Sequence, residues 1–112
     1  MTKIQLITEA LDDIKLKDIT VYDMREKSPF FDYFILSTAS NTRQLKASIN
    51  QIKEALSNTK YDIKSIEGAT SDSWILIDTS DIIINIFTEQ ERHHYNIEKM
   101  WMDIDTIPID KL

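Results

Sequence analysis

Two short apolar runs lie close together in the second half of the chain. They are Trp74–Ile77, with the sequence WILI, and Ile82–Phe87, with the sequence IIINIF. Each run is too short for a typical helix, and the many isoleucines favour a largely buried β-strand. The DTSD segment between the runs has the composition of a turn. The pattern predicts a strand hairpin around which the rest of the chain is organised.

Alternation along a strand assigns successive side chains to opposite faces. Trp74, Leu76 and Asp78 share one face of the first predicted strand. In the second strand one face is wholly isoleucine, whereas the other carries Asn85 between two apolar side chains. The polar residues therefore indicate the less completely covered side of the hairpin.

Helical periodicity appears twice in the first half of the chain. Residues 2–14 carry an apolar stripe, and Thr2 with Gln5 can form a capping box at its start. Residues 37–42 supply several candidate caps for a second helix, which is expected to end near Asn58. Stripes of this kind are typical of helices that pack on a sheet. Their members are Ile4, Ile7, Leu11 and Ile14 in the first helix and Leu45, Ile49, Ile52 and Leu56 in the second.

Three further segments have strand character. Ile19–Met24 has the composition of a strand, and Tyr33–Leu36 is continuously apolar, which predicts a central strand covered on both faces. Lys60–Ile66 is a weaker strand candidate. Gly68, the only glycine, follows it and is expected to adopt a turn conformation that other residues resist.

The segment after the hairpin predicts a helical tail. Thr88 and Glu91 fit a capping box, so a helical turn is expected to begin at Glu89. Asn96 is a second possible N-cap, and Pro108 ends any helical pattern. The second short helix would carry Ile97, Trp101 and Ile104 on one stripe.

The order of these elements predicts an α/β fold with a mixed sheet of about five strands flanked by helices. With 112 residues and 42% hydrophobic composition, the chain is expected to form one domain over residues 1–112. The chain has no cysteine and no apolar stretch near the roughly 18 residues of a membrane span. We therefore expect a soluble cytoplasmic protein without membrane contact.

The net charge of -6, from 19 acidic and 13 basic residues, disfavours binding to free nucleic acid. A basic protein partner suits this charge better. The alternative is that the charge only keeps a small domain soluble.

Candidate catalytic and metal sites are weak. The sequence has no G-x-S-x-G motif, and a chain with one glycine cannot form a glycine-rich phosphate loop, so no cofactor is expected. His94 and Glu98 could share a metal ion, although a surface pair is the more common outcome. Asp78 and Asp81 could bind a divalent cation, but acids in a hairpin turn are usually turn formers.

Aromatic and arginine side chains are the better candidates for function. Trp74, Tyr95 and Trp101 are either core residues or anchors of a protein interface. Arg43 and Arg92 similarly serve either in ion pairs and caps or in contact with a partner. The sequence leaves both alternatives open.

Several blocks together resemble the ribosomal silencing factor family, also called the Iojap family. The resemblance covers residues 6–103, leaving 104–112 as a short tail, and it rests on the joint order of the blocks. The chain departs from the family pattern at Ala39, where a glycine is usual, at Thr79-Ser80, where an aromatic or apolar residue plus glycine is usual, and at Asn85, where a histidine is usual. The matching blocks are Asp32-Tyr33-Phe34-Ile35, Ser40-Asn41-Thr42-Arg43-Gln44, Glu67-Gly68, Trp74–Asp78, Asp81–Phe87, and Glu91-Arg92 with Tyr95, Glu98 and Trp101.

The resemblance implies a non-catalytic factor that docks on the large ribosomal subunit through that subunit's fourteenth protein. Docking would exclude the small subunit sterically and so lower translation. The implied fold is similar to that of nucleotidyltransferases, without their catalytic motifs. The residues expected to contact the partner are Trp74, Leu76, Asp78, Asp81, Asn85, Arg92 and Tyr95.

Two other functions compete with this one. A nucleotidyltransferase would need a Gly-Ser turn and paired carboxylates on a strand, whereas here Gly68-Ala69 lacks the serine and Asp78 is the only acid on the Trp74 strand. A homodimeric scaffold for a different protein remains open, and a homodimer is also possible when the factor is off the ribosome.

Overall fold

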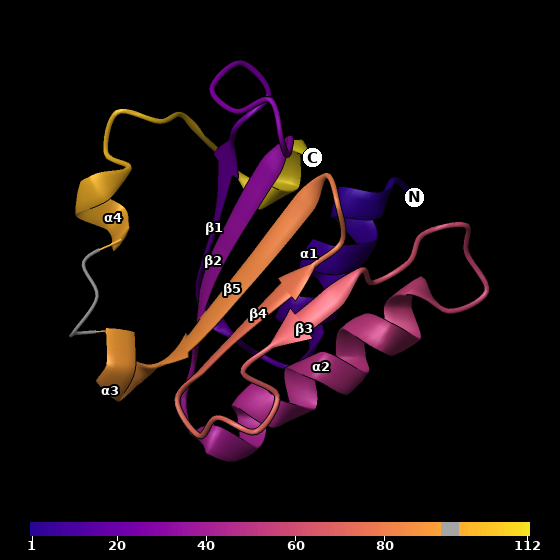
Figure 1. The fold of residues 1–112 in the computed structure, drawn as a ribbon, viewed down its shortest axis with the longest axis vertical. Helices are drawn as coiled ribbons and strands as arrows, with labels where there is room; N and C mark the ends of the chain where they lie inside the picture. Colours follow the sequence, from indigo (N-terminus) through magenta and orange to yellow (C-terminus); the bar gives the residue numbers. More distant parts are fainter. Residues whose placement is uncertain (93–96) are drawn as a thin grey trace.

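A mixed sheet runs through the centre of the protein in the computed structural model, which describes residues 1–92 and 97–112 (Figure 1). Over these residues the sheet has six strands in the order β3-β4-β5-β2-β1-β6. β2 and β5 pair in parallel, and every other pair is antiparallel. The strands are β1 Lys17–Asp23, β2 Tyr33–Ala39, β3 Ser65–Glu67, β4 Trp74–Asp78, β5 Ile82–Thr88 and β6 Thr106–Ile107.

The α/β fold with a mixed sheet is confirmed, but the expected number of about five strands was too low. The additional strand is β6, which pairs with Val21 and Tyr22 at the edge of the sheet. The sequence offers no periodicity for a strand of this length, because two residues cannot show alternation. The predicted central position of Tyr33–Leu36 is confirmed, since β2 lies between β5 and β1.

Two helices, α1 Lys3–Asp13 and α2 Thr42–Leu56, cover one face of the sheet (Figure 1). The predicted capping box of Thr2 and Gln5 is present at the start of α1. α2 begins after Asn41, whose side chain accepts a 2.8 Å hydrogen bond from the Gln44 amide. The apolar stripes of both helices pack with the isoleucines of β4 and β5 into the main core.

The predicted hairpin is confirmed as β4 and β5, joined by a tight turn. The Asp78 carboxylate accepts a 2.8 Å hydrogen bond from the Ser80 amide, which lies at a positive φ of 77°. Asp78 is therefore a turn former, as expected for an acid at this place. The weak strand predicted over Lys60–Ile66 is shorter in the structure, where β3 begins only at Ser65.

The segment after β5 contains two short helices, α3 Glu89–Arg92 and α4 Ile97–Met100. α3 begins at Glu89 as predicted, and the Thr88 hydroxyl accepts a 3.4 Å hydrogen bond from the Glu91 amide. The proposed cap at Asn96 lies outside the described residues. The expected helical stripe is wrong in extent, because α4 ends at Met100 and Trp101 lies in the following turn. A final 3-10 turn, η1 Ile109–Lys111, follows Pro108.

Among the described residues, no helix is both long enough and apolar enough to cross a membrane.

Candidate protein-interaction site

The face of the sheet opposite α1 and α2, here called the outer face, is set by the strand registers. Trp74 pairs with Phe87, and Leu76 pairs with Asn85. Leu36 lies opposite Asn85 on the other side of β5. Residues paired across neighbouring strands point the same way, so these side chains form one surface. The outer face consists of Glu67, Trp74, Leu76, Asp78, Ile83, Asn85, Phe87, Phe34, Leu36, Thr38 and Tyr22.

Trp101 covers the half of the outer face that lies over β1 and β2. Its ring meets Phe34 at 4.1 Å between centroids and Tyr22 at 5.3 Å, both in edge-on geometry. Phe31 and Ile104 pack against the same cluster. Trp101 is thus a packing residue of a second core, which resolves the alternative that the sequence left open for it.

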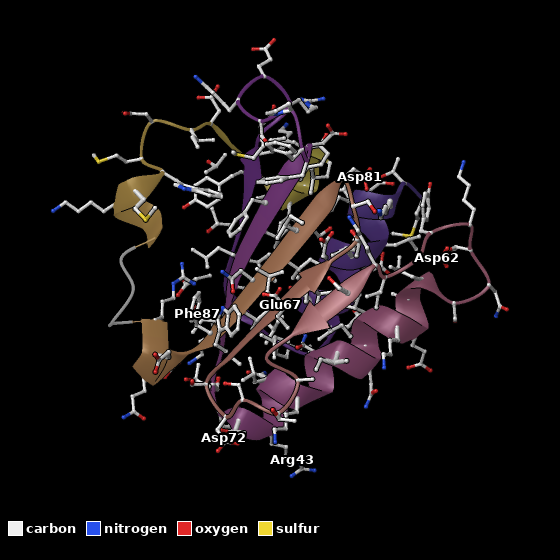
Figure 2. All side chains as sticks on the ribbon, viewed as in Figure 1. Arg43, Asp62, Glu67, Asp72, Asp81 and Phe87 are labelled. Carbon is white, nitrogen blue, oxygen red and sulfur yellow. The ribbon has the colours of Figure 1, made fainter. Side chains whose placement is uncertain are left out.

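Trp74 and Leu76 lie on the other half of this face and are only partly buried. Glu67, opposite Leu76 on the edge strand β3, is exposed. The labelled side chains of Glu67 and Phe87 extend from the strands on either side of β4 (Figure 2). We call the region formed by Glu67, Trp74, Leu76, Asn85 and Phe87 the open half of the outer face, in which Asn85 and Phe87 are themselves buried.

A hollow of about 370 Å³, here called the Trp74 hollow, lies at one end of the open half. Trp74 and Phe87 line it with aromatic surface, and Ser71, Ser73 and Glu91 add polar groups. Within the described part of the chain, the Glu91 carboxylate forms no ion pair. Aromatic walls beside a carboxylate suit a side chain that is apolar along its length and cationic or N–H-bearing at its tip.

The loop before β4 holds Trp74 in position. The Ser71 hydroxyl accepts 3.2 Å hydrogen bonds from the amides of both Ser73 and Trp74. Gly68 has the predicted positive φ, at 79°, and a Cβ atom there would lie 2.5 Å from the Trp74 carbonyl oxygen and 2.9 Å from the indole ring. The close approach of Gly68 explains why this turn uses the only glycine of the chain.

Asn85 lies in the middle of the outer face, between Leu76 and Leu36 in register. Its side chain is 7% exposed, and its Oδ1 atom is buried without a hydrogen-bond donor from the described residues. A buried amide without a partner is uncommon in folded proteins, because the lost hydrogen bonds to water are not replaced.

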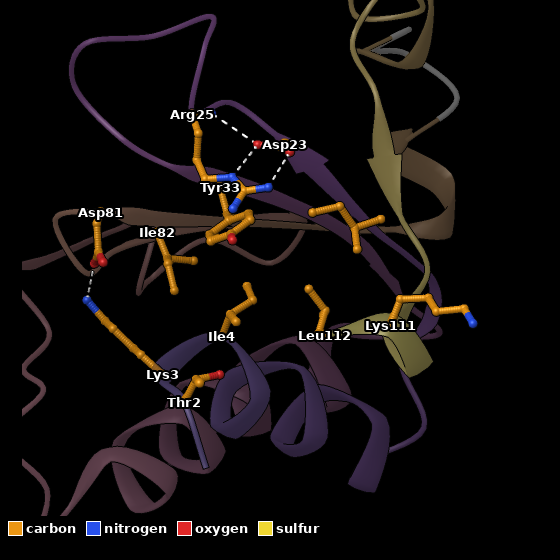
Figure 3. A pocket seen from close by; sticks show the side chains of 11 residues that line it. Thr2, Lys3, Ile4, Asp23, Arg25, Tyr33, Asp81, Ile82, Lys111 and Leu112 are labelled. Carbon is orange, nitrogen blue, oxygen red and sulfur yellow. Dashed lines mark hydrogen bonds and ion pairs between the residues drawn. The ribbon is translucent and has the colours of Figure 1, made fainter.

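The structure brings Trp74, Leu76 and Asn85 together but separates Asp81 from them. Asp81 lies at the far end of the hairpin from Phe87 and Asp72 (Figure 2). Its carboxylate forms a 2.5 Å ion pair with Lys3 (Figure 3). The Lys3 ammonium group also donates to the Thr79 carbonyl. Asp81 therefore ties the hairpin turn to the start of α1.

Arg92 and Tyr95 belong to the segment beyond β5. The Arg92 guanidinium donates a hydrogen bond to the Thr38 hydroxyl and so fastens the end of α3 to β2. Its position is that of a structural anchor beside the open half. Tyr95 lies outside the described residues, as does the proposed metal pair of His94 with Glu98. Over the described residues, no group of three His, Cys, Asp or Glu could hold a metal ion.

A second hollow, of about 530 Å³, lies between the start of α1 and the ends of β1 and β6 (Figure 3). The Asp81–Lys3 pair lies on one side of it and the Asp23–Arg25 pair on the other. Arg25 donates to both carboxylate oxygens of Asp23, at 2.9 and 2.8 Å, which lowers the pKa of Asp23 and raises that of Arg25. These four charges neutralise one another in two pairs, and Lys111 is a further charged side chain in the lining.

Sequence reasoning missed Glu67, Phe87, Glu91 and the two serines of the Trp74 hollow. Phe87 could have been found, because it alternates with Asn85 on the same strand face. Glu91, Ser71 and Ser73 come from segments before β4 and after β5, and they meet only because the hairpin pairs its ends.

Comparison with known proteins places these features in a family. The family model "Ribosomal silencing factor during starvation" matches residues 1–112. A ribosomal silencing factor of Chromobacterium violaceum is 35% identical over 97 residues, which cover 87% of this chain and 80% of that protein. One from Halalkalibacterium halodurans is 30% identical over 107 residues, covering 96% and 92% respectively.

Comparison of the fold with solved structures finds a protein from one of the same organisms. A crystal structure of a Chromobacterium violaceum protein, 33% identical in sequence, superposes with a TM-score of 0.83. The superposition covers 91% of this chain and 88% of that one.

Proposed function

Because the chain belongs to the ribosomal silencing factor family, we propose that it represses translation by binding the large ribosomal subunit and preventing the small subunit from joining. The contact is made with the fourteenth protein of the large subunit, in the cytoplasm where subunits join. The inhibition is steric, since the bound factor occupies space that the small subunit needs.

The open half of the outer face carries this proposal. Trp74 and Leu76 are large apolar side chains that remain partly exposed on a rigid strand, next to the Trp74 hollow. Aromatic side chains at the rim of a pocket are the usual centres of binding energy in protein interfaces. Glu67 and Glu91 supply a polar rim around this apolar centre.

Charge supports a basic protein as the partner. The chain has a net charge of -6, and the acids near the open half include Glu67 and Glu91. Ribosomal proteins contact RNA phosphates and are rich in lysine and arginine for that reason. Opposite charges on the two surfaces steer the partners together.

The proposal requires no catalysis. The family is named for silencing, which is a regulatory role. On the outer face of β4, Asp78 is the single acid, and its carboxylate is used by the hairpin turn. A two-metal transferase would need a second carboxylate beside it.

Sedimentation with purified ribosomal subunits tests the proposal. The protein is mixed with large or small subunits and centrifuged through a sucrose cushion, and the pellets are analysed for bound factor. We expect factor in the large-subunit pellet and none with the small subunit. Equal recovery with both subunits, or recovery with neither, would refute the proposed binding.

A further inference from the structure

Two buried side-chain oxygens lack a hydrogen-bond partner within the described residues, Asn85 Oδ1 and Ser37 Oγ. Each destabilises the fold, because a polar group removed from water keeps its desolvation cost when no protein group replaces the lost hydrogen bonds. A leucine of similar size would avoid this cost at position 85.

The two residues differ in where they lie. Ser37 is fully buried and pairs with Ile86, so it points into the core beneath α1 and α2. Asn85 pairs with Leu76 and points to the outer face. Leu76, the neighbour of Asn85 on β4, is partly exposed, so on the side of the open half Asn85 lies close to the molecular surface. A docked chain can therefore reach Asn85, whereas it cannot reach Ser37.

The terminal amide of an asparagine rotates easily, because its last torsion has a broad, roughly two-fold profile. Rotation exchanges the positions of Oδ1 and the amide nitrogen. The small part of Asn85 that remains exposed can thus present the oxygen to a partner without any movement of β5.

We infer that Asn85 is a specificity-determining residue of the open half, whose carboxamide oxygen accepts a hydrogen bond from an N–H group of the docked partner. This inference rests on the proposed function, because it assigns a role within the same docking surface. The partner must bring an N–H donor on a segment that is otherwise apolar enough to lie against Leu76 and Trp74.

Selectivity follows from the burial of the site. A partner with the donor pairs with the oxygen that the rotated carboxamide presents, and this hydrogen bond offsets the cost of burying it. A partner without the donor buries the carboxamide further and gains nothing in return. Sites built around a buried polar group reject ligands that cannot pair with it far more strongly than apolar pockets reject a ligand of the wrong size.

The test compares folding and binding in the same variant. Asn85→Leu removes the unpaired amide and keeps the side-chain volume nearly constant. Its urea denaturation midpoint is expected to rise above that of the wild type. Its dissociation constant for purified large subunits is expected to increase at least about tenfold, which corresponds to about 1.4 kcal/mol.

Ser37→Ala is the matched control. It also removes an unpaired buried oxygen, but from the face that no partner can reach. Its affinity for large subunits is expected to equal that of the wild type. Should Asn85→Leu not fold, Asn85→Ala also removes the acceptor without adding volume, and it is expected to show the same loss of affinity.

The possible results separate the two proposals. If the wild type does not bind large subunits, the proposed function itself is refuted. If the wild type binds and the Asn85 variant binds within twofold of it, the docking function stands and the role of Asn85 is refuted. A folded Asn85→Leu variant that is both less stable and less tightly bound than the wild type would indicate a structural role, which also overturns the inference.

Discussion

Gly68 and Trp74 show how one backbone position prepares the docking surface. The Gly68 backbone packs closely against Trp74, the first residue of β4, and leaves no room for a side chain at position 68. The Ser71 hydroxyl fixes the Trp74 amide from the other side of the loop. A preorganised anchor loses less conformational freedom when it binds, which favours affinity.

Replacement of Gly68 by alanine tests this arrangement. Gly68→Ala places a methyl group against the Trp74 carbonyl and strains a residue with positive φ, so it is expected to lower the free energy of unfolding by at least about 1 kcal/mol. Urea denaturation measures the loss. Ser80→Gly is the control, because Ser80 has a similar φ of 77°. Glycine adopts this φ without strain, so this variant is expected not to lower the free energy of unfolding. An unchanged midpoint in Gly68→Ala would show that the turn tolerates a Cβ atom.

At the residue scale, the sequence predicted the features that depend only on neighbouring residues. Alternation placed Trp74, Leu76 and Asp78 on one face, and the single glycine marked a turn with positive φ. It could not place Asp81, because its Lys3 partner comes from the other end of the chain. Long-range ion pairs leave no periodic pattern in a sequence.

Among the elements, the segment after β5 decides how much of the outer face is open. Trp101 packs on Phe34 and Tyr22, and this contact holds the turn after α4 over β1 and β2. Arg92 fastens α3 to β2 at the near end of the same segment. The covered half therefore acts as a second core, which also includes Phe87 and packs against Trp74, and the surface that we propose for docking lies beside it.

We expect Trp101→Ala to act mainly on stability. Loss of the indole from its aromatic contacts should lower the free energy of unfolding by about 3 kcal/mol, at the low end for a large aromatic because Trp101 is partly exposed. Met102→Ala, at a side chain that is 75% exposed, should change it by less than about 0.5 kcal/mol. Thermal or urea unfolding of the two variants provides the comparison. Equal stability of both variants would contradict the assignment of Trp101 to a core.

Elements with an apolar stripe, a strongly apolar run or a capping motif were predicted well, whereas the two shortest strands were not. α1 and α2 each carry an apolar stripe and a side-chain cap, so the existence of both helices and the start of α1 followed from the sequence. Residues 37–42 offered several caps for α2, and the structure uses Asn41. β3 and β6 have few residues and owe their structure to the neighbouring strands that they pair with. Pairing of this kind is a tertiary effect that overrides local propensity.

For the whole molecule, charge and shape act at different stages of binding. Under the proposed function, the net charge of -6 is expected to speed the encounter with a basic surface, and the open half of the outer face is expected to determine how long the complex lasts. Steric exclusion then needs only a bound factor of sufficient size at the subunit interface.

The association rate with large subunits is therefore expected to fall as the salt concentration rises. At about 0.15 M salt, charges further apart than about 8 Å are largely screened. Stopped-flow measurements of fluorescently labelled factor at several salt concentrations give this rate. Glu67→Gln should reduce the salt dependence, because it removes an exposed charge next to Leu76. A rate that does not vary with salt would exclude electrostatic steering.

The central claim is that the Trp74 face docks on the large subunit and so blocks joining, and light scattering of subunit joining tests it most directly. Wild-type factor is expected to slow the joining of separated subunits. Folded Trp74→Ala is expected to bind at least about 2 kcal/mol more weakly, about thirtyfold, and to let joining proceed at the same factor concentration. Undiminished joining in the presence of bound wild-type factor would contradict steric silencing, and a Trp74→Ala variant as inhibitory as the wild type would show that this face is not the docking site.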